Sequence, residues 1–303
     1  MIQIIEKQES FSYFFKKNLI VVKGVFRQQW QIAKSYLSNT SIAFIVPIVM
    51  TALPLLLIRA VGVDEQLIAA NFFGGHSGSI SGFIAIGSNI WMLMLAILWD
   101  FSTYLRDEQM TGTLETLLMS PAKRYSIIAG RASFSILFNV IISFFATIIS
   151  LLIFARDMLF EIGLLPLFLL LVLTVIGCLP MIGLSYFIGA LVLKFKEVYS
   201  LVNLLQWFFG LIMGVYVPIT SLPLIVRVFS IMFPATWSVS DIRAITAGSP
   251  PMLLLLGIKN AGFPILISTL IVIGFAIFWG IIGFVVFSKY ELKIKRNEGL
   301  SKY

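Results

Sequence analysis

RDEQMTGTLETLLMSP, residues 106–121, is the polar stretch that organises the chain, because it separates two long apolar segments. Gly112 can end or bend the helix before it, and Pro121 stops a helix. Residues 113–119 predict a short amphipathic helix between them. Three leucines at i, i+3 and i+4 share one face of it: Leu114, Leu117 and Leu118. Such a helix could lie flat on a membrane or dock into a groove of another protein.

The composition identifies an all-α integral membrane protein. Of the 303 residues, 59% are hydrophobic and 12% are charged, and the mean hydropathy is +1.00. A soluble domain of this length does not need so much apolar surface. The apolar runs are long and lack strand alternation, so we expect helical spans rather than barrel strands.

Six apolar runs predict six transmembrane helices within a single domain over residues 1–303. They lie at about 41–58, 82–100, 132–155, 165–193, 199–217 and 262–288. Between the last two, a full crossing at 222–239 would bury Arg227 near its centre, which is costly. We therefore expect short re-entrant helices on the outer side before the last span, where protein covers the irregular backbone.

Residues 10–37 predict an amphipathic helix at the membrane interface. Spacings of 7, 4 and 7 place four cations on one stripe: Lys16, Lys23, Arg27 and Lys34. A separate apolar face holds Phe15, Leu19, Val22, Phe26 and Ala33. A basic stripe beside an apolar face suits the anionic inner surface of a bilayer. Contact with a protein partner is compatible with this position.

The distribution of charge predicts the orientation. With both termini inside, the inner segments hold 17 of the 22 Lys and Arg residues. A seventh crossing would place the basic tail after residue 288 outside, against the positive-inside rule. We expect a multi-pass protein of a bacterial or archaeal cytoplasmic membrane with both termini cytoplasmic.

The sequence lacks the residues for most catalytic and ion-driven chemistry. It contains no G-x-x-x-x-G-K-[ST] motif for ATP, and one His and one Cys make a metal or nucleophile cluster implausible. No acidic pair lies inside a span, which disfavours a proton- or sodium-driven carrier. No filter sequence indicates a channel.

Polar amides inside the spans need partners. Helix–helix hydrogen bonds would satisfy them. Alternatively, they line a transport path, together with a neighbouring indole. The candidates for such a path are Asn89, Asn203, Gln206 and Trp207.

The stretch 106–131 resembles the cytoplasmic loop of ABC type-2 transporter permeases. The matching positions are Glu108, Gly112, Thr113, Leu114, Glu115, Leu117, Leu118, Ser120, Pro121, Arg124 and Gly130. In that family the loop carries a coupling helix that sits in a cleft of an ATPase subunit. The rest of the chain resembles the family in its layout.

The resemblance implies the permease subunit of an ABC exporter. It implies two permease chains, identical or different, with two ATPase subunits that bind ATP and magnesium, and no cofactor in this chain. It also implies that the second and fifth spans line the route, and that the substrate is an amphiphile such as a drug, lipid, peptide or glycan. The partners would be the ATPase, a second permease and membrane lipid, without nucleic acid. A stand-alone secondary transporter or channel is the alternative, and a membrane-embedded enzyme is a third.

Overall fold

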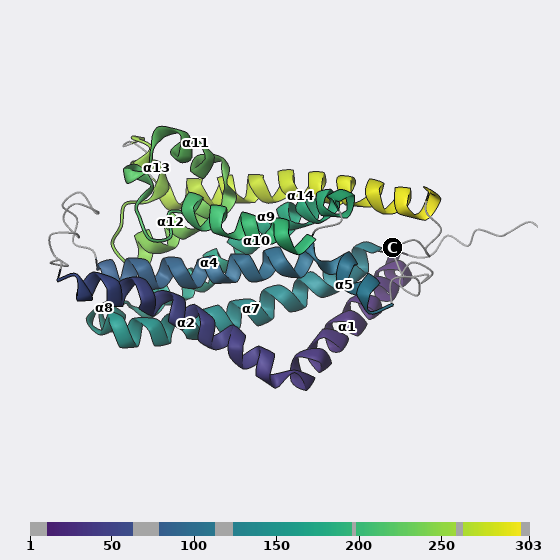
Figure 1. The fold of residues 1–303 in the computed structure, drawn as a ribbon, viewed down its shortest axis with the longest axis horizontal. Coiled ribbons are helices and arrows are strands. Elements are labelled where there is room, and N and C mark those ends of the chain that lie inside the picture. Colours follow the sequence, from purple (N-terminus) through teal and green to yellow (C-terminus); the bar gives the residue numbers. More distant parts are fainter. Residues whose placement is uncertain (1–10, 63–78, 113–123, 196–197, 259–262, 298–303) are drawn as a thin grey trace, which may run out of the picture.

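The computed structural model of the chain describes residues 11–62, 79–112, 124–195, 198–258 and 263–297 (Figure 1). Within these ranges the chain is helical throughout its regular structure and contains no strand. The all-α prediction is therefore confirmed.

Among the described residues, five helices are long and apolar enough to cross a membrane. They are α2 (Leu37–Ala60), α4 (Ile80–Ser102), α7 (Arg124–Phe154), α9 (Leu164–Phe195) and α14 (Pro264–Asn297). These helices lie at five of the six positions that the apolar runs predict. The chain is accordingly a multi-pass membrane protein.

The remaining predicted span is shorter than expected. Helix α10 (Val198–Ile212) has 15 residues and ends five residues before Val217. Gly214 follows it with a φ of 64°, a left-handed conformation that ends helices, and Pro218 lies four residues further on. The charge-free run continues past this turn, which explains why hydropathy placed the end of the helix too late.

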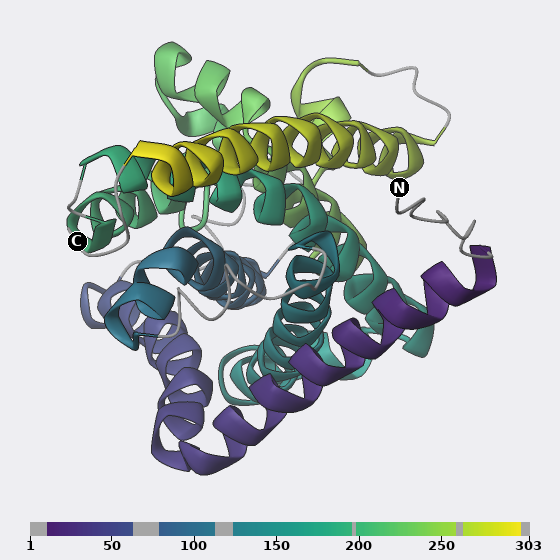
Figure 2. The same ribbon diagram turned by 90° about the vertical axis from the view of Figure 1, so that its right-hand side faces the viewer.

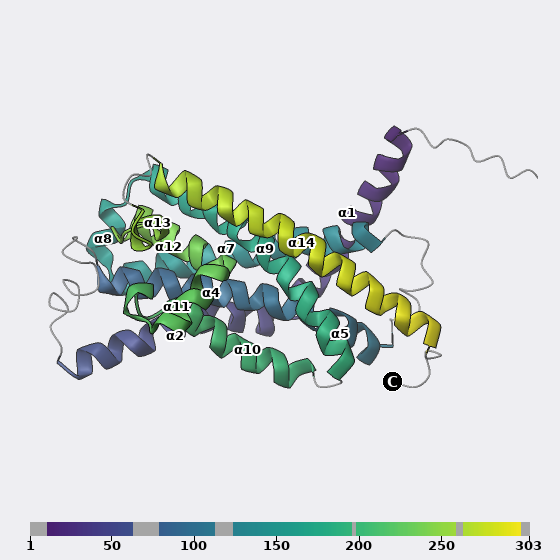
Figure 3. The ribbon, with the colours of Figure 1, turned by 90° about the horizontal axis from the view of Figure 1, so that it is seen from above.

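Helix α4 is the centre of the bundle. It is almost entirely buried and packs against α2, α7, α9 and α10 (Figures 1 and 3). Helix α14 packs along α9, where Gly183 and Gly283 let the two backbones approach closely. The core of the single chain therefore comes from the helices around α4, with α14 added on the outer side of α9.

Short helices gather toward the two ends of the bundle. Helix α5 (Tyr104–Met110) lies at one end, which we call the loop end, and α8 (Arg156–Glu161) lies at the other, the opposite end (Figure 1).

The region before α14 contains η1 (Ile219–Ser221), α11 (Leu224–Met232), α12 (Pro234–Thr246) and α13 (Met252–Leu255). Helices α11 and α12 meet at an angle of 91°. Pro234 begins α12 and fits its first turn, where no backbone donor is needed. A single straight crossing is thereby excluded here, and the re-entrant assignment stays a prediction.

Helix α1 (Phe11–Ser35) crosses the outside of α7 near the loop end (Figure 2). Ser126 Oγ donates a hydrogen bond of 3.0 Å to Oδ1 of Asn18. Gly130 of α7 faces Val22 and Val25, and a Cβ there would lie 2.9 Å from the carbonyl oxygen of Val22. A helix thus lies within the predicted range 10–37, and α7 covers part of its apolar face; its place at the membrane interface stays a prediction.

Candidate functional site

The predicted coupling loop is described only at its beginning. Glu108 is half-buried on α5, and Gly112 is exposed with a φ of 70° just after that helix. The other predicted coupling residues lie outside the described ranges: Thr113, Leu114, Glu115, Leu117, Leu118, Ser120 and Pro121. The left-handed conformation of Gly112 agrees with its predicted role as the point where the preceding helix ends.

The first stem of the loop, α5, is tied to α10 through one carboxylate. Thr103 Oγ1 donates to Oδ2 of Asp107 at 2.8 Å, and the hydroxyl of Tyr199 donates to Oδ1 of the same residue at 3.0 Å. The Tyr199 ring also stacks on Trp99, with ring centroids 6.3 Å apart. A displacement of α5 would therefore move Tyr199 and the start of α10 directly.

The second stem, the beginning of α7, is tied to α4 through Asp100. Ser135 Oγ donates to Oδ2 of Asp100 at 2.5 Å, and Asn139 donates to the same oxygen at 3.4 Å. Arg131 donates to the backbone carbonyl of Asp100 at 3.2 Å, and its guanidinium lies 4.3 Å from the ring of Tyr104 on α5. We call Asp100, Tyr104, Arg131, Ser135 and Asn139 the stem cluster.

The stem cluster joins both sides of the loop into one unit. Sequence reasoning missed it, although two signals were present. Asp100 stands at the end of an apolar run, and Ser135 and Asn139 are four residues apart and so share a face of the next helix.

Three of the four predicted path residues lie together on α10. Gln206 accepts a hydrogen bond of 3.1 Å from the indole of Trp99 and donates one to Oδ1 of Asn203. Asn203 is exposed, and Trp207 retains 62% of its surface. We call Asn203, Gln206 and Trp207 the amide face of α10. Exposed amides on an apolar helix need a partner or water, so this face is the candidate contact surface of the single chain.

Asn89 does not join the amide face. It is fully buried in α4, where its amide donates to the carbonyl of Ala85 at 2.7 Å and to the hydroxyls of Thr51 and Ser150, each at 3.2 Å. These bonds connect α4 with α2 and α7. These bonds agree with the first alternative for the amides, hydrogen bonding between helices. The second alternative, that Asn89 lines a transport path, stays a prediction.

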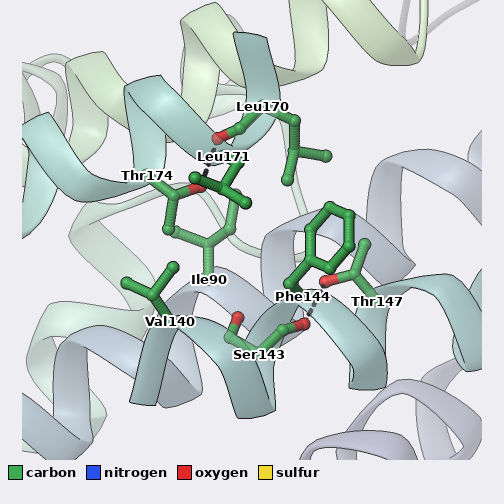
Figure 4. A pocket seen from close by; sticks show the side chains of 8 residues that line it. All are labelled: Ile90, Val140, Ser143, Phe144, Thr147, Leu170, Leu171 and Thr174. Atoms are coloured by element: carbon green, nitrogen blue, oxygen red, sulfur yellow. Dashed lines mark hydrogen bonds between the residues drawn. The ribbon is translucent and has the colours of Figure 1, made fainter. Parts of the chain in front are cut away.

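A small recess lies beside this buried network, between α4, α7 and α9. Ile90, Ser143, Thr147 and Thr174 are among the side chains that line it (Figure 4). Its volume is about 10 Å³, which is about the space that one water molecule needs. A second recess, beside Arg243 at the opposite end, measures about 20 Å³. Neither recess has room for an amphiphile.

Arg243 connects several segments at the opposite end of the bundle. Sequence reasoning did not identify this residue as important. The guanidinium is 3% exposed and donates to three backbone carbonyls, those of Phe83 at 3.1 Å, Gly214 at 2.8 Å and Val215 at 2.5 Å. It also lies 3.5 Å from the centre of the Phe83 ring. Gly87 provides the space, because a Cβ there would lie 1.7 Å from Nη2 of Arg243.

Arg243 thereby joins α12, the start of α4 and the turn after α10. The carbonyls of Gly214 and Val215 follow the last turn of α10, where the helix itself offers no donor. The carbonyl groups of the turn that ends α10 thus accept hydrogen bonds from a side chain of α12, 29 residues after Gly214.

Among the described residues no three His, Cys, Asp or Glu side chains gather in a group that could hold a metal. In comparison with known proteins, a family model described as ABC-2 type transporter matches residues 18–246. No curated protein matches the chain.

Proposed function

The chain belongs to the ABC-2 type transporter family and is a transporter permease, and from this premise we propose that it is the membrane subunit of an ATP-driven exporter. The family match begins at residue 18 within α1, includes the polar loop at 106–121 and ends with α12. ATP and magnesium would bind to a separate ATPase, and two copies of that subunit would act with two permease chains.

The observation that carries this proposal is the attachment of the polar loop. Both stems of the loop are anchored, α5 to α10 through Asp107 and α7 to α4 through Asp100. An ATPase that held the loop at residues 113–119 could therefore move α4, α7 and α10 together. If the attachments were mobile, the loop could move without moving the spans.

The transport path is proposed to lie between two permease chains. Within one chain the two recesses described above have room for about one or two water molecules. The amide face of α10, in contrast, is open on the outside of the single chain. A second copy facing it would enclose amides and aromatic rings, which can hold an amphiphile without a full charge. A drug, lipid, peptide or glycan conjugate fits that chemistry.

The loop end is proposed to be cytoplasmic, in a bacterial or archaeal cell membrane. The support is the charge distribution, in which 17 of the 22 Lys and Arg residues fall on the segments assigned inside. Export then requires that the amide face opens alternately toward the loop end and the opposite end.

The alternative is a secondary transporter or channel that works alone. Co-purification separates the two proposals, because only an ABC permease should bring an ATPase with it from native membranes. The expected result is an ATPase in equal amount to the permease, with hydrolysis that responds to candidate amphiphiles. Transport by the chain alone in vesicles, driven by an ion gradient, would favour the alternative.

A further inference from the structure

Part of the apolar side of α1 packs against the protein itself, on α7. Val22 and Val25 face Gly130, and the rings of Phe26 and Trp30 lie 5.5 and 6.5 Å from that of Phe134. An amphipathic helix that needed lipid to cover this side would leave it unpacked. Here α7 covers part of it, so the surface of α1 that is left for the membrane is the part that α7 leaves open.

The basic stripe of α1 lies away from α7. Lys16, Lys23, Arg27 and Lys34 are all exposed, and helical spacing places them on a different face from Val22 and Val25. Helix α1 contains no Asp or Glu, and within the described parts of the chain no carboxylate pairs with these four cations. At 1.5 Å per residue the stripe is about 27 Å long.

Helix α1 lies beside the bundle, rather than beneath it. Seen along the bundle from the loop end, α1 runs across its edge (Figure 2). The next helix begins at Leu37, and its apolar span begins at Ser41. The end of α1 therefore lies only a few residues before the segment that enters the hydrocarbon core. This position is the level of the lipid headgroups.

Exposed apolar side chains interleave with the cations. Leu19 and Ile20 are 40% and 70% exposed, and Trp30 is 44% exposed with Nζ of Lys34 5.2 Å from its ring centre. Trp and Lys together are typical of the membrane–water interface. Apolar groups beside cations fit the boundary between lipid headgroups and acyl chains.

We propose that the stripe of Lys16, Lys23, Arg27 and Lys34 binds the phosphate headgroups of anionic lipids along the edge of the permease. This goes beyond the transport function and does not depend on it. The stripe attracts the phosphates, and the interleaved apolar side chains contact the upper acyl chains. Through Gly130 and Phe134, the bound lipid would contribute to the position of α7, which is the second stem of the loop.

The test uses the full chain in lipid nanodiscs, with a bimane fluorophore on Gln31→Cys in a Cys178→Ala background. Quenching by brominated phosphatidylglycerol is compared with quenching by brominated phosphatidylcholine at the same fraction. One Lys or Arg near an anionic surface contributes about 1 kcal/mol, or about fivefold, so we expect at least about a fivefold preference for phosphatidylglycerol at low salt. About 0.5 M salt should reduce the preference strongly.

Three variants identify the source of the preference. The change Lys16→Gln, Lys23→Gln, Arg27→Gln and Lys34→Gln should abolish it. Exchange of Lys for Arg and Arg for Lys at the same four positions should keep it, and Lys17→Gln, off the stripe, should change it little.

If both lipids quench equally in the protein with an unmodified stripe, the proposal is overturned. This result holds even if the neutral variant fails to fold. A neutral variant that kept the lipid preference but lost a co-purifying ATPase would also overturn it, and would assign the stripe to a protein partner.

Discussion

The indole nitrogen of Trp99 donates a 3.1 Å hydrogen bond to the side-chain oxygen of Gln206 and so ties the loop end of α4 to the amide face of α10. Tyr199 stacks on the same indole and bonds to Asp107 on the loop stem. Helix α10 is therefore attached to the stem through a short series of side chains. In the proposed mechanism this series carries a displacement of the loop to the surface that contacts substrate.

Gln206→Leu should change the response to substrate and leave assembly intact. The substitution removes the bonds to Trp99 and Asn203 at a half-exposed position, each of which contributes about 1 kcal/mol net. We expect altered substrate stimulation of ATP hydrolysis or an altered substrate range, measured on the reconstituted complex. Gln28→Leu on α1 is the control. If Gln206→Leu lowers only the yield of folded protein, the side chain is structural.

Arg243→Met should strongly destabilise the opposite end of the bundle. The carbonyls of Phe83, Gly214 and Val215 would lose a donor, and each unpaired buried group costs about 1–3 kcal/mol. We expect a clear decrease in the unfolding temperature in detergent, and a similar decrease for Gly87→Ala. Arg156→Met, at an exposed position on α8, is the matched control. Equal unfolding temperatures for Arg243→Met and its control would contradict this role.

Gly283→Ala should separate α9 from α14. A Cβ at residue 283 would lie 2.1 Å from the carbonyl oxygen of Gly183, and backbone cannot move aside as a side chain can. Gly280→Ala, one turn earlier on α14, is the control because no heavy atom lies within 4 Å of its Cβ. Thermal unfolding should show a loss for the first variant. The second should be neutral or gain up to about 1 kcal/mol from helix propensity.

Cysteine labelling should distinguish the two ends of the bundle. In a Cys178→Ala background, Asp157→Cys on α8 should react with a membrane-impermeant maleimide in intact cells. Thr111→Cys, after α5, should react only once the cells are permeabilised. Both native positions are exposed, so accessibility of the side chain does not limit the comparison. The reverse pattern would invert the proposed orientation.

Run length predicted the five long helices well, because a membrane requires about 20 consecutive apolar residues whatever the tertiary contacts are. It did not predict the end of α10, where a left-handed Gly214 stops the helix inside a charge-free run. Charge and motif patterns predicted the basic stripe of α1 and the position of the loop. They did not show that α7 covers the apolar side of α1.

Sequence reasoning anticipated helix–helix hydrogen bonds for the amides, but it did not identify the partners in the polar contacts between distant segments. Arg243 and Phe83 are 160 residues apart, and Asp100 and Ser135 are 35 apart. A single sequence contains no information that pairs such residues. The amides were visible in the sequence, but only the fold separates buried Asn89 from the open face with Gln206.

In the proposed exporter, residues 113–119 dock into an ATPase through Leu114, Leu117 and Leu118. Burial of a leucine contributes roughly 1.5–3 kcal/mol, and a lysine in its place would bury an unpaired charge. A lysine at the surface of a membrane could instead extend into the anionic interface. Thr116→Lys is the matched control, because it adds the same charge beside the leucine face.

The direct measurement is the amount and activity of ATPase that co-purifies with Leu117→Lys, compared with Thr116→Lys and the unmodified chain. We expect that Leu117→Lys folds with its spans intact but loses the ATPase, whereas Thr116→Lys retains most of it. Recovery of an active ATPase with Leu117→Lys at the level of the unmodified chain would contradict the coupling-helix assignment.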